Sequence, residues 1–255
     1  MNFEIIDFHT HPFYFDEENI CAHKGYIPMS PDSFLDDMER LGIKHFAGSV
    51  ISRRGDGAEM MKSCNESAFG LREIYGEKYI PGIQIDPHYV EESISEIDEM
   101  IKHGFKLIGE LVPYHYGWDY SHDGLYEILD YTKDKNLVYS FHTMDHIQME
   151  AVAERYKDTA FVFAHPGEKP ALLKQIDIMK RHENVYLDLS GTGLFRYGML
   201  KRLVCEVGAE RIIFGSDYPV CNPGMYVGGV MLEKITDKEK DLIFSENAKR
   251  LLDIK

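Results

Sequence analysis

Eight short apolar runs recur along the chain, separated by loops and by stretches whose apolar residues have helical spacing. Near-continuous apolar strands that alternate with helices are typical of a parallel sheet covered on both faces. Eight such strands predict an α/β fold of the (β/α)8 TIM-barrel type, with a doubly wound open sheet as the main alternative. The expected strands are 3–8, 44–50, 79–85, 105–111, 137–142, 160–165, 184–190 and 211–217.

Helix boundaries between these runs are also marked. Ser30 can cap a helix that has Pro31 in its first turn, and Gly104 can end a helix that precedes the fourth strand. A length of 255 residues, 44% of them hydrophobic, suits one barrel that uses the whole chain. We therefore expect a single domain over residues 1–255.

Charge and cysteine content limit the partners that we expect. The formal net charge of −15 provides no basic surface for nucleic acid or for an anionic membrane. No apolar stretch is long enough to span a bilayer, and the N-terminus does not resemble an export signal. The four cysteines stand far apart, which indicates neither a disulfide framework nor a cysteine zinc site. A cytoplasmic enzyme with a small-molecule substrate is expected, with a homodimer possible.

Polar residues of the types that bind metals stand at the ends of five predicted strands. In a barrel, the carboxyl ends of the strands form the active-site face. His9 and His11 are two residues apart on a strand, so their side chains point the same way. A single histidine at a strand end is usually structural, but a joint set of histidines and carboxylates is expensive to bury without a cation. The set predicted to bind metal is His9, His11, Glu110, His142, His165 and Asp217.

Asp7, in the same "DFHTHP" segment, has a different expected role. We expect it to be a carboxylate in the barrel interior or one that supports the ligands, while His9 and His11 bind the ion.

The segments around these residues resemble the amidohydrolase superfamily of metal-dependent barrels, over essentially the whole chain. "DFHTHP" is similar to its first-strand motif, "FHT" to its fifth, "AHPG" to its sixth and "FGSDYP" to its eighth. The last two look most like the amidohydrolase-related branch, which contains hydrolases, lactonases and aromatic-acid decarboxylases. The resemblance implies a metal-dependent enzyme and does not specify its substrate.

Glu110 departs from the pattern of many members of that superfamily. Members with two metals often use a carboxylated lysine on the fourth strand, whereas "LIGELVPYHY" places a glutamate there, similar to TatD-like deoxyribonucleases. By resemblance, His9, His11 and Asp217 with Glu110 would hold one ion, and Glu110, His142 and His165 a second. Glu110 could instead orient a metal-bound histidine. Nitrogen and oxygen donors suit one or two Zn²⁺ ions, with Mn²⁺, Fe²⁺ or Ni²⁺ as alternatives.

The expected chemistry is hydrolysis by a metal-activated water, with Asp217 as the general base. The substrate would be a small ester, lactone, amide or phosphoester, with an anionic group. The alternative is a lyase, a decarboxylase or hydratase of an aromatic or unsaturated carboxylic acid. It requires one metal and leaves His165 free as an acid or base, so Glu110 counts against it. A TatD-like deoxyribonuclease fits the net charge less well, and a non-catalytic metal-binding scaffold is the remaining alternative.

Two loops contain the candidate substrate-binding residues. Arg53 and Arg54 follow the second strand and could bind a carboxylate or phosphate, or could simply be solvated. Tyr114 and His115 follow the fourth strand and could form a pocket wall, or could pack within the loop. Tyr218, directly after Asp217, is a further candidate.

Overall fold

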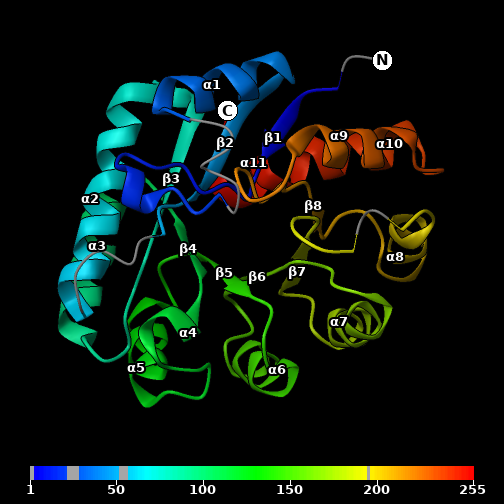
Figure 1. Cartoon of the computed structure of the whole chain (residues 1–255). Helices are drawn as coiled ribbons and strands as arrows, with labels where there is room; N and C mark the ends of the chain where they lie inside the picture. The colour runs from blue at the N-terminus through cyan, green and yellow to red at the C-terminus, as the bar shows by residue number, and fades with distance from the viewer. Residues whose placement is uncertain (1–2, 22–28, 52–56, 194–195) are drawn as a thin grey trace.

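A single eight-stranded parallel sheet forms the centre of the computed structural model, which describes residues 3–21, 29–51, 57–193 and 196–255. Each strand pairs with the next strand along the chain, in the order β1 to β8 (Figure 1). The strands are β1 (Ile5–Asp7), β2 (Ile43–Ser49), β3 (Tyr79–Ile83), β4 (Leu107–Leu111), β5 (Val138–His142), β6 (Ala160–Ala164), β7 (Val185–Asp188) and β8 (Ile212–Ile213). All eight lie at the positions that the sequence predicts.

The sheet closes on itself through the segments that follow β1 and β8. The Phe8 amide donates to the Phe214 carbonyl oxygen at 2.9 Å, and the Asp217 amide donates to the His9 carbonyl oxygen at 2.8 Å. Because the first and last strands are joined in this way, the prediction of a TIM barrel is confirmed and the doubly wound sheet is excluded.

Helices form an outer layer around the strands (Figure 1). They are α1 (Pro31–Arg40), α2 (Gly57–Tyr75), α3 (Val90–Lys102), α4 (Pro113–Tyr116), α5 (Asp123–Thr132), α6 (His146–Arg155), α7 (Lys169–Arg181), α8 (Met199–Val207), α9 (Pro223–Leu232), α10 (Asp237–Asp241) and α11 (Asn247–Leu252). The described part of the chain also contains three short helical turns: η1 (Asp16–Glu18), η2 (Gly76–Lys78) and η3 (Leu242–Glu246). Within the described residues, no helix is both long enough and apolar enough to cross a membrane.

Local sequence signals set the helix ends as expected. The Ser30 hydroxyl accepts a hydrogen bond from the Ser33 amide at the start of α1, and Pro31 is the first helical residue. After α3, Gly104 has a φ of +80°, a left-handed conformation that favours glycine.

The amino-terminal end of the barrel is filled by apolar side chains. Residues of the strands, such as Ile6 and Leu107, form one buried cluster with Ala248 and Leu252 of α11. Lys106 forms an ion pair with Asp253, just beyond α11. The polar strand ends therefore gather at the opposite, carboxyl-terminal end, as the barrel geometry requires.

Candidate metal centre

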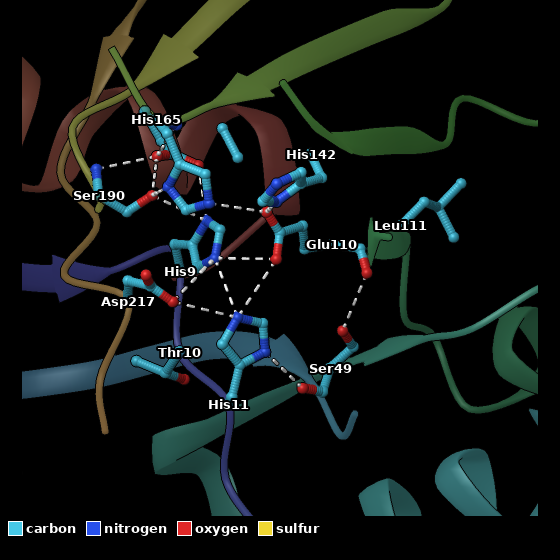
Figure 2. Close-up of polar contacts among 12 residues, drawn as sticks. His9, Thr10, His11, Ser49, Glu110, Leu111, His142, His165, Ser190 and Asp217 are labelled. Atoms are coloured by element: carbon cyan, nitrogen blue, oxygen red, sulfur yellow. Dashed lines mark hydrogen bonds and ion pairs between the residues drawn. The ribbon is translucent and has the colours of Figure 1, made fainter. Parts of the chain in front are cut away.

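Four side chains from the N-terminal, middle and C-terminal parts of the chain converge at the carboxyl end of the barrel (Figure 2). His9 and His11 follow β1, with their Nε2 atoms 3.1 Å apart. Glu110, on β4, places Oε2 3.4 Å from the His9 Nε2 and 3.3 Å from the His11 Nε2. Asp217, after β8, places Oδ1 3.4 Å from the His11 Nε2 and 3.8 Å from the His9 Nε2. All four residues are buried.

These separations suit a single divalent cation. Bonds of about 2.0–2.2 Å to nitrogen and oxygen donors in a tetrahedron give donor-to-donor distances of about 3.3–3.6 Å. The measured distances of 3.1 to 3.8 Å span that range. His9, His11 and Asp217 form one group whose donor atoms are close enough to share an ion, and His9, Glu110 and His165 form a second. The residues present therefore fit a metal ion.

Both histidines are held with Nε2 turned toward the centre. The Nδ1 of His9 lies 2.8 Å from Asp188 Oδ2, and the Nδ1 of His11 lies 3.0 Å from the Ser49 carbonyl oxygen. Because these oxygens accept hydrogen bonds, each Nδ1 carries a proton, and Nε2 is the nitrogen that can bind a cation once its own proton is displaced.

The two oxygens of Glu110 face different histidines. Oε2 faces His9 and His11, whereas Oε1 lies 2.8 Å from His142 Nδ1 and 3.1 Å from His165 Nε2. Burial alone would raise the pKa of Glu110, but the charges of His9 and His165 and hydrogen bonds from its neighbours hold that pKa well below its ordinary value. Glu110 is therefore an anion shared between two pairs of imidazoles.

The centre favours positive charge. Burial lowers the pKa of His11, but hydrogen bonds to Asp217 and Glu110 outweigh it and raise the pKa to about 9. Burial likewise lowers the pKa of His9, but the charges of Asp188 and Glu110 raise it well above its ordinary value. A site that holds protons this strongly is also one in which a divalent cation can replace them.

Two residues of the centre have a strained backbone. His165 has a φ of +66° and Asp217 a φ of +63°, values that non-glycine residues seldom adopt. The Asp217 carbonyl oxygen accepts hydrogen bonds from the Val220 and Cys221 amides, and the His165 carbonyl oxygen accepts one from Gln175 Nε2. These bonds hold both side chains toward the centre.

Sequence reasoning missed the contribution of β7. Asp188 is completely buried and binds the His9 ring, while the Ser190 hydroxyl lies 2.9 Å from His165 Nδ1. The sequence did contain a signal for this role. The segment "YLDLS" ends in a carboxylate and a hydroxyl, just as other strands end in residues that can bind a metal. A carboxylate that supports an imidazole has the same local pattern as one that binds an ion.

Asp7 lies in the barrel interior but supports backbone rather than an imidazole. Its Oδ1 accepts hydrogen bonds from the His9 amide at 3.2 Å and the Ser216 amide at 3.0 Å. Complete burial raises the pKa of Asp7 to about 7. Asp7 thus ties the end of β1 to the end of β8.

The predicted substrate-binding residues lie in different surroundings. Tyr114 is exposed, with its ring centre 5.5 Å from that of His142, and His115 contacts Tyr114. Tyr218 is buried, and its hydroxyl donates to Asp37 of α1 at 2.6 Å. Arg53 and Arg54 lie outside the described residues. The structure thus brings Tyr114 to the centre's rim and directs the Tyr218 hydroxyl to α1.

Comparison with models of protein families gives a match over almost the whole chain. A family model described as "Amidohydrolase" matches residues 6–254. No curated protein matches the chain by sequence.

Several solved structures share the fold over nearly their whole length. An uncharacterised TIM-barrel protein from Bordetella bronchiseptica has a TM-score of 0.79 at 18% identity, covering 97% of this chain and 98% of its own. A 2,6-dihydroxybenzoate decarboxylase from Rhizobium has a TM-score of 0.75 at 13% identity, covering 98% of each chain. A dihydroxybenzoic acid decarboxylase from Polaromonas sp. JS666, with bound manganese and the inhibitor 2-nitroresorcinol, has a TM-score of 0.70 at 15% identity, covering 98% of this chain and 97% of its own. At these identities the likeness is one of fold.

Proposed function

The chain belongs to the amidohydrolase family, and from that premise we propose that it is a metal-dependent decarboxylase of an aromatic or unsaturated carboxylic acid. The observation that carries the proposal is that Nε2 of His9 and His11 each lie within 3.8 Å of a carboxylate oxygen of both Glu110 and Asp217, so these donors can hold one ion and leave His142 and His165 for other roles. The activity of the Rhizobium and Polaromonas proteins supports the same choice.

The bound ion is proposed to be Mn²⁺ or Zn²⁺. The donor set of two imidazoles and two carboxylates suits either metal, and manganese is bound in the Polaromonas protein. A divalent cation at this point would bind and polarise oxygen atoms of the substrate. Asp188 and Ser49 keep the two histidines in the tautomer that this requires.

His165 is proposed as the proton donor. Its Nδ1 is held by the Ser190 hydroxyl, and its Nε2 lies beside Glu110 at the centre. Burial lowers the pKa of His165, but the charge of Glu110 and a hydrogen bond to it outweigh burial and raise that pKa above its ordinary value, which favours the protonated ring. In the proposed reaction the bond between the carboxyl carbon and its neighbour breaks, carbon dioxide leaves, and the remaining carbon takes a proton from His165 Nε2.

A hydrolase with two ions is the second candidate. The observation that favours it is the position of Glu110 Oε1 between His142 Nδ1 and His165 Nε2, which would supply donors for a second ion. In that case Asp217 would be the general base for a water molecule, and Glu110 would bridge the two ions.

Metal analysis and product analysis together separate the two candidates. We expect one ion per chain, and carbon dioxide release from a dihydroxybenzoate, with one deuterium in the product when the reaction runs in D₂O. His165→Gln should keep the ion and slow carbon dioxide release by about 10² or more. Two ions per chain, with the second lost in His165→Gln and with hydrolysis of ester or lactone substrates, would instead establish the hydrolase.

A further inference from the structure

We propose that Gln175 of α7 is a positioning residue for the imidazole pair of His142 and His165. It acts through Thr143, which follows β5, and through the backbone on both sides of His165. The expected effect on turnover rests on the proposed function, since His165 is its proton donor. The expected effect on the position of the His165 ring does not depend on that function.

Gln175 occupies an apolar position of α7. It follows the helical spacing of Leu172, Ile176 and Met179, which are all apolar and buried. The Gln175 side chain is completely buried, and its Oε1 has no hydrogen-bond partner among the described residues. A buried amide oxygen without a partner destabilises the fold, whereas an apolar side chain could pack at this position. The presence of an amide is therefore explained by its other polar atom, Nε2.

The Nε2 atom of Gln175 donates to Thr143 Oγ1 at 3.2 Å and to the His165 carbonyl oxygen at 3.0 Å. The Thr143 hydroxyl donates in turn to the Ala164 carbonyl oxygen, so its own oxygen can accept from Gln175. These three hydrogen bonds form the β5–β6 clamp. They fix the carbonyl groups directly before and after the φ torsion of His165, which is +66°. Rotation about that torsion would break at least one of the bonds, so the clamp holds the direction of the ring.

The β5–β6 clamp also sets His165 relative to His142. Thr143 directly follows His142, whose carbonyl oxygen accepts a hydrogen bond from the buried Tyr120 hydroxyl at 2.8 Å. The two ring centres are 4.9 Å apart, and Glu110 Oε1 lies 2.8 Å from His142 Nδ1 and 3.1 Å from His165 Nε2. Without the clamp, His165 could move while Tyr120 still held His142. The contact of His165 Nε2 with Glu110 would then change.

A matching amide lies at the opposite end of the barrel. Asn247 of α11 is completely buried, and its Nδ2 donates to the carbonyl oxygens of Ala209 and Ile212 at 2.7 and 2.8 Å. Its Oδ1 has no hydrogen-bond partner within the described part of the chain. Ile212 is the first residue of β8, so this amide supports the amino-terminal end of the barrel. Asn247 therefore serves as the control for loss of a buried amide that affects folding alone.

NMR spectra of the imidazole nitrogens test the proposal without turnover, in the full-length protein loaded with Zn²⁺ and labelled with ¹⁵N at its histidines. His142→Gln and His165→Gln identify the signals of the two rings. Gln175→Met keeps the length of the side chain and removes the donor. It should shift and broaden the His165 signals, while the His11 signals should keep their positions.

Thr143 provides a pair of matched variants. Thr143→Val keeps the branched shape and removes the hydroxyl, so it should change the His165 signals as Gln175→Met does. Thr143→Ser retains the hydroxyl and should keep the wild-type signals. Asn247→Leu should lower Tm and leave the His165 signals in place.

Turnover should respond in kcat rather than in KM. Gln175→Met and Thr143→Val should each lower kcat for carbon dioxide release by about tenfold or more, because the proton donor is displaced. KM and Zn²⁺ affinity should be retained, since the four donors of the ion are unchanged. The double variant should be no slower than the slower single variant, because both substitutions break the same clamp.

The proposal is overturned if the His165 signals are unchanged in both Gln175→Met and Thr143→Val, or if Asn247→Leu disturbs them equally. It is also overturned if Thr143→Ser changes them as much as Thr143→Val does. If Gln175→Met does not fold, the two Thr143 variants decide, since Thr143 is only half-buried. Altered His165 signals in variants of a protein that releases no carbon dioxide from any acid would keep the positioning role and reject the decarboxylase.

Discussion

At the scale of single residues, the centre depends on which atom of each histidine is protonated. His9 and His11 both present Nε2 because Asp188 and Ser49 bind the opposite nitrogen. The Asp188 oxygen that faces His9 is bound to the Nδ1 atom of that ring and not to the ion. Through this hydrogen bond Asp188 determines how well His9 Nε2 can bind the ion. Its effect is therefore expected on metal affinity rather than on folding.

Asp188→Asn is expected to weaken metal binding by about 10- to 100-fold, because an amide can present its NH₂ group to Nδ1 and favour the wrong tautomer. A competition titration with a chromogenic chelator measures the change. Asp86→Asn is the matched control, since Asp86 is a buried carboxylate that binds His88 Nδ1 at 2.8 Å outside the centre. Equal effects of the two substitutions would contradict the role of Asp188.

Metal affinity is expected to rise with pH between 6 and 9. The pKa of His11 is raised to about 9, so the proton is fully bound below its ordinary value of 6.5 and is lost as the pH passes about 9. A metal ion must displace that proton, which gives up to about tenfold in affinity per pH unit for each proton released. Titrations of Mn²⁺ at fixed pH values measure the slope, and affinity independent of pH would rule out this competition.

The His11 proton also affects the stability of the metal-free protein, which falls as the pH rises. A group whose pKa is raised on folding stabilises the folded state at low pH, and this contribution disappears as the pH rises through the folded pKa. The metal-free form should thus lose stability between pH 6.5 and about 9 as His11 is deprotonated.

At the scale of elements, the segments after β6, β7 and β8 have local backbone conformations that hold side chains at the centre. The segment after β7 is the clearest case, because Gly191 has a φ of +62° and leaves no room for a Cβ beside His165. The strands themselves follow from their apolar patterns. The conformation of the segment after β7 depends instead on the close approach of Gly191 to the His165 ring, which follows β6.

Gly191→Ala is expected to displace the His165 ring and lower turnover by about tenfold or more, with the ion retained. The control is Gly76→Ala, where φ is +60° but an added Cβ meets nothing within 4 Å. Both variants should lose stability to backbone strain by a similar amount, about 1 kcal/mol. Only the first should lose turnover, and equal turnover in the two would remove the steric argument.

At the scale of the whole molecule, the proposed ion joins the two ends of the chain. Its donors follow β1, lie in β4 and follow β8, so the site exists only when the barrel is closed. A ligand that binds the folded state alone stabilises it by mass action.

Thermal unfolding should therefore respond to metal. At a free Mn²⁺ or Zn²⁺ concentration of about 100 Kd, the stabilisation is about 2.7 kcal/mol, which raises Tm by roughly 5–10 °C for a chain of this size. A chelator should reverse the shift. The double variant His11→Ala, Asp217→Asn should show no shift, and an undiminished shift in that variant would place the ion elsewhere.

Much of this organisation was predictable from the sequence, because it depends on local patterns. Strands, helix caps and the convergence of His9, His11, Glu110 and Asp217 follow from polar residues that end apolar runs in a barrel. The role of Asp188 was missed because a carboxylate at a strand end can bind metal, support an imidazole or bond to backbone, and the local sequence is the same in each case.

The sequence by itself determined the barrel and the chemical types gathered at its carboxyl end, since periodicity and strand order act over a few residues at a time. Only the tertiary structure decided which role each of these residues has. It set Glu110 Oε2 toward His9 and His11 and Oε1 toward His142 and His165, and it placed Gly191, after β7, against the His165 ring. These relations depend on side-chain directions and on contacts between segments far apart in the chain, which packing alone determines.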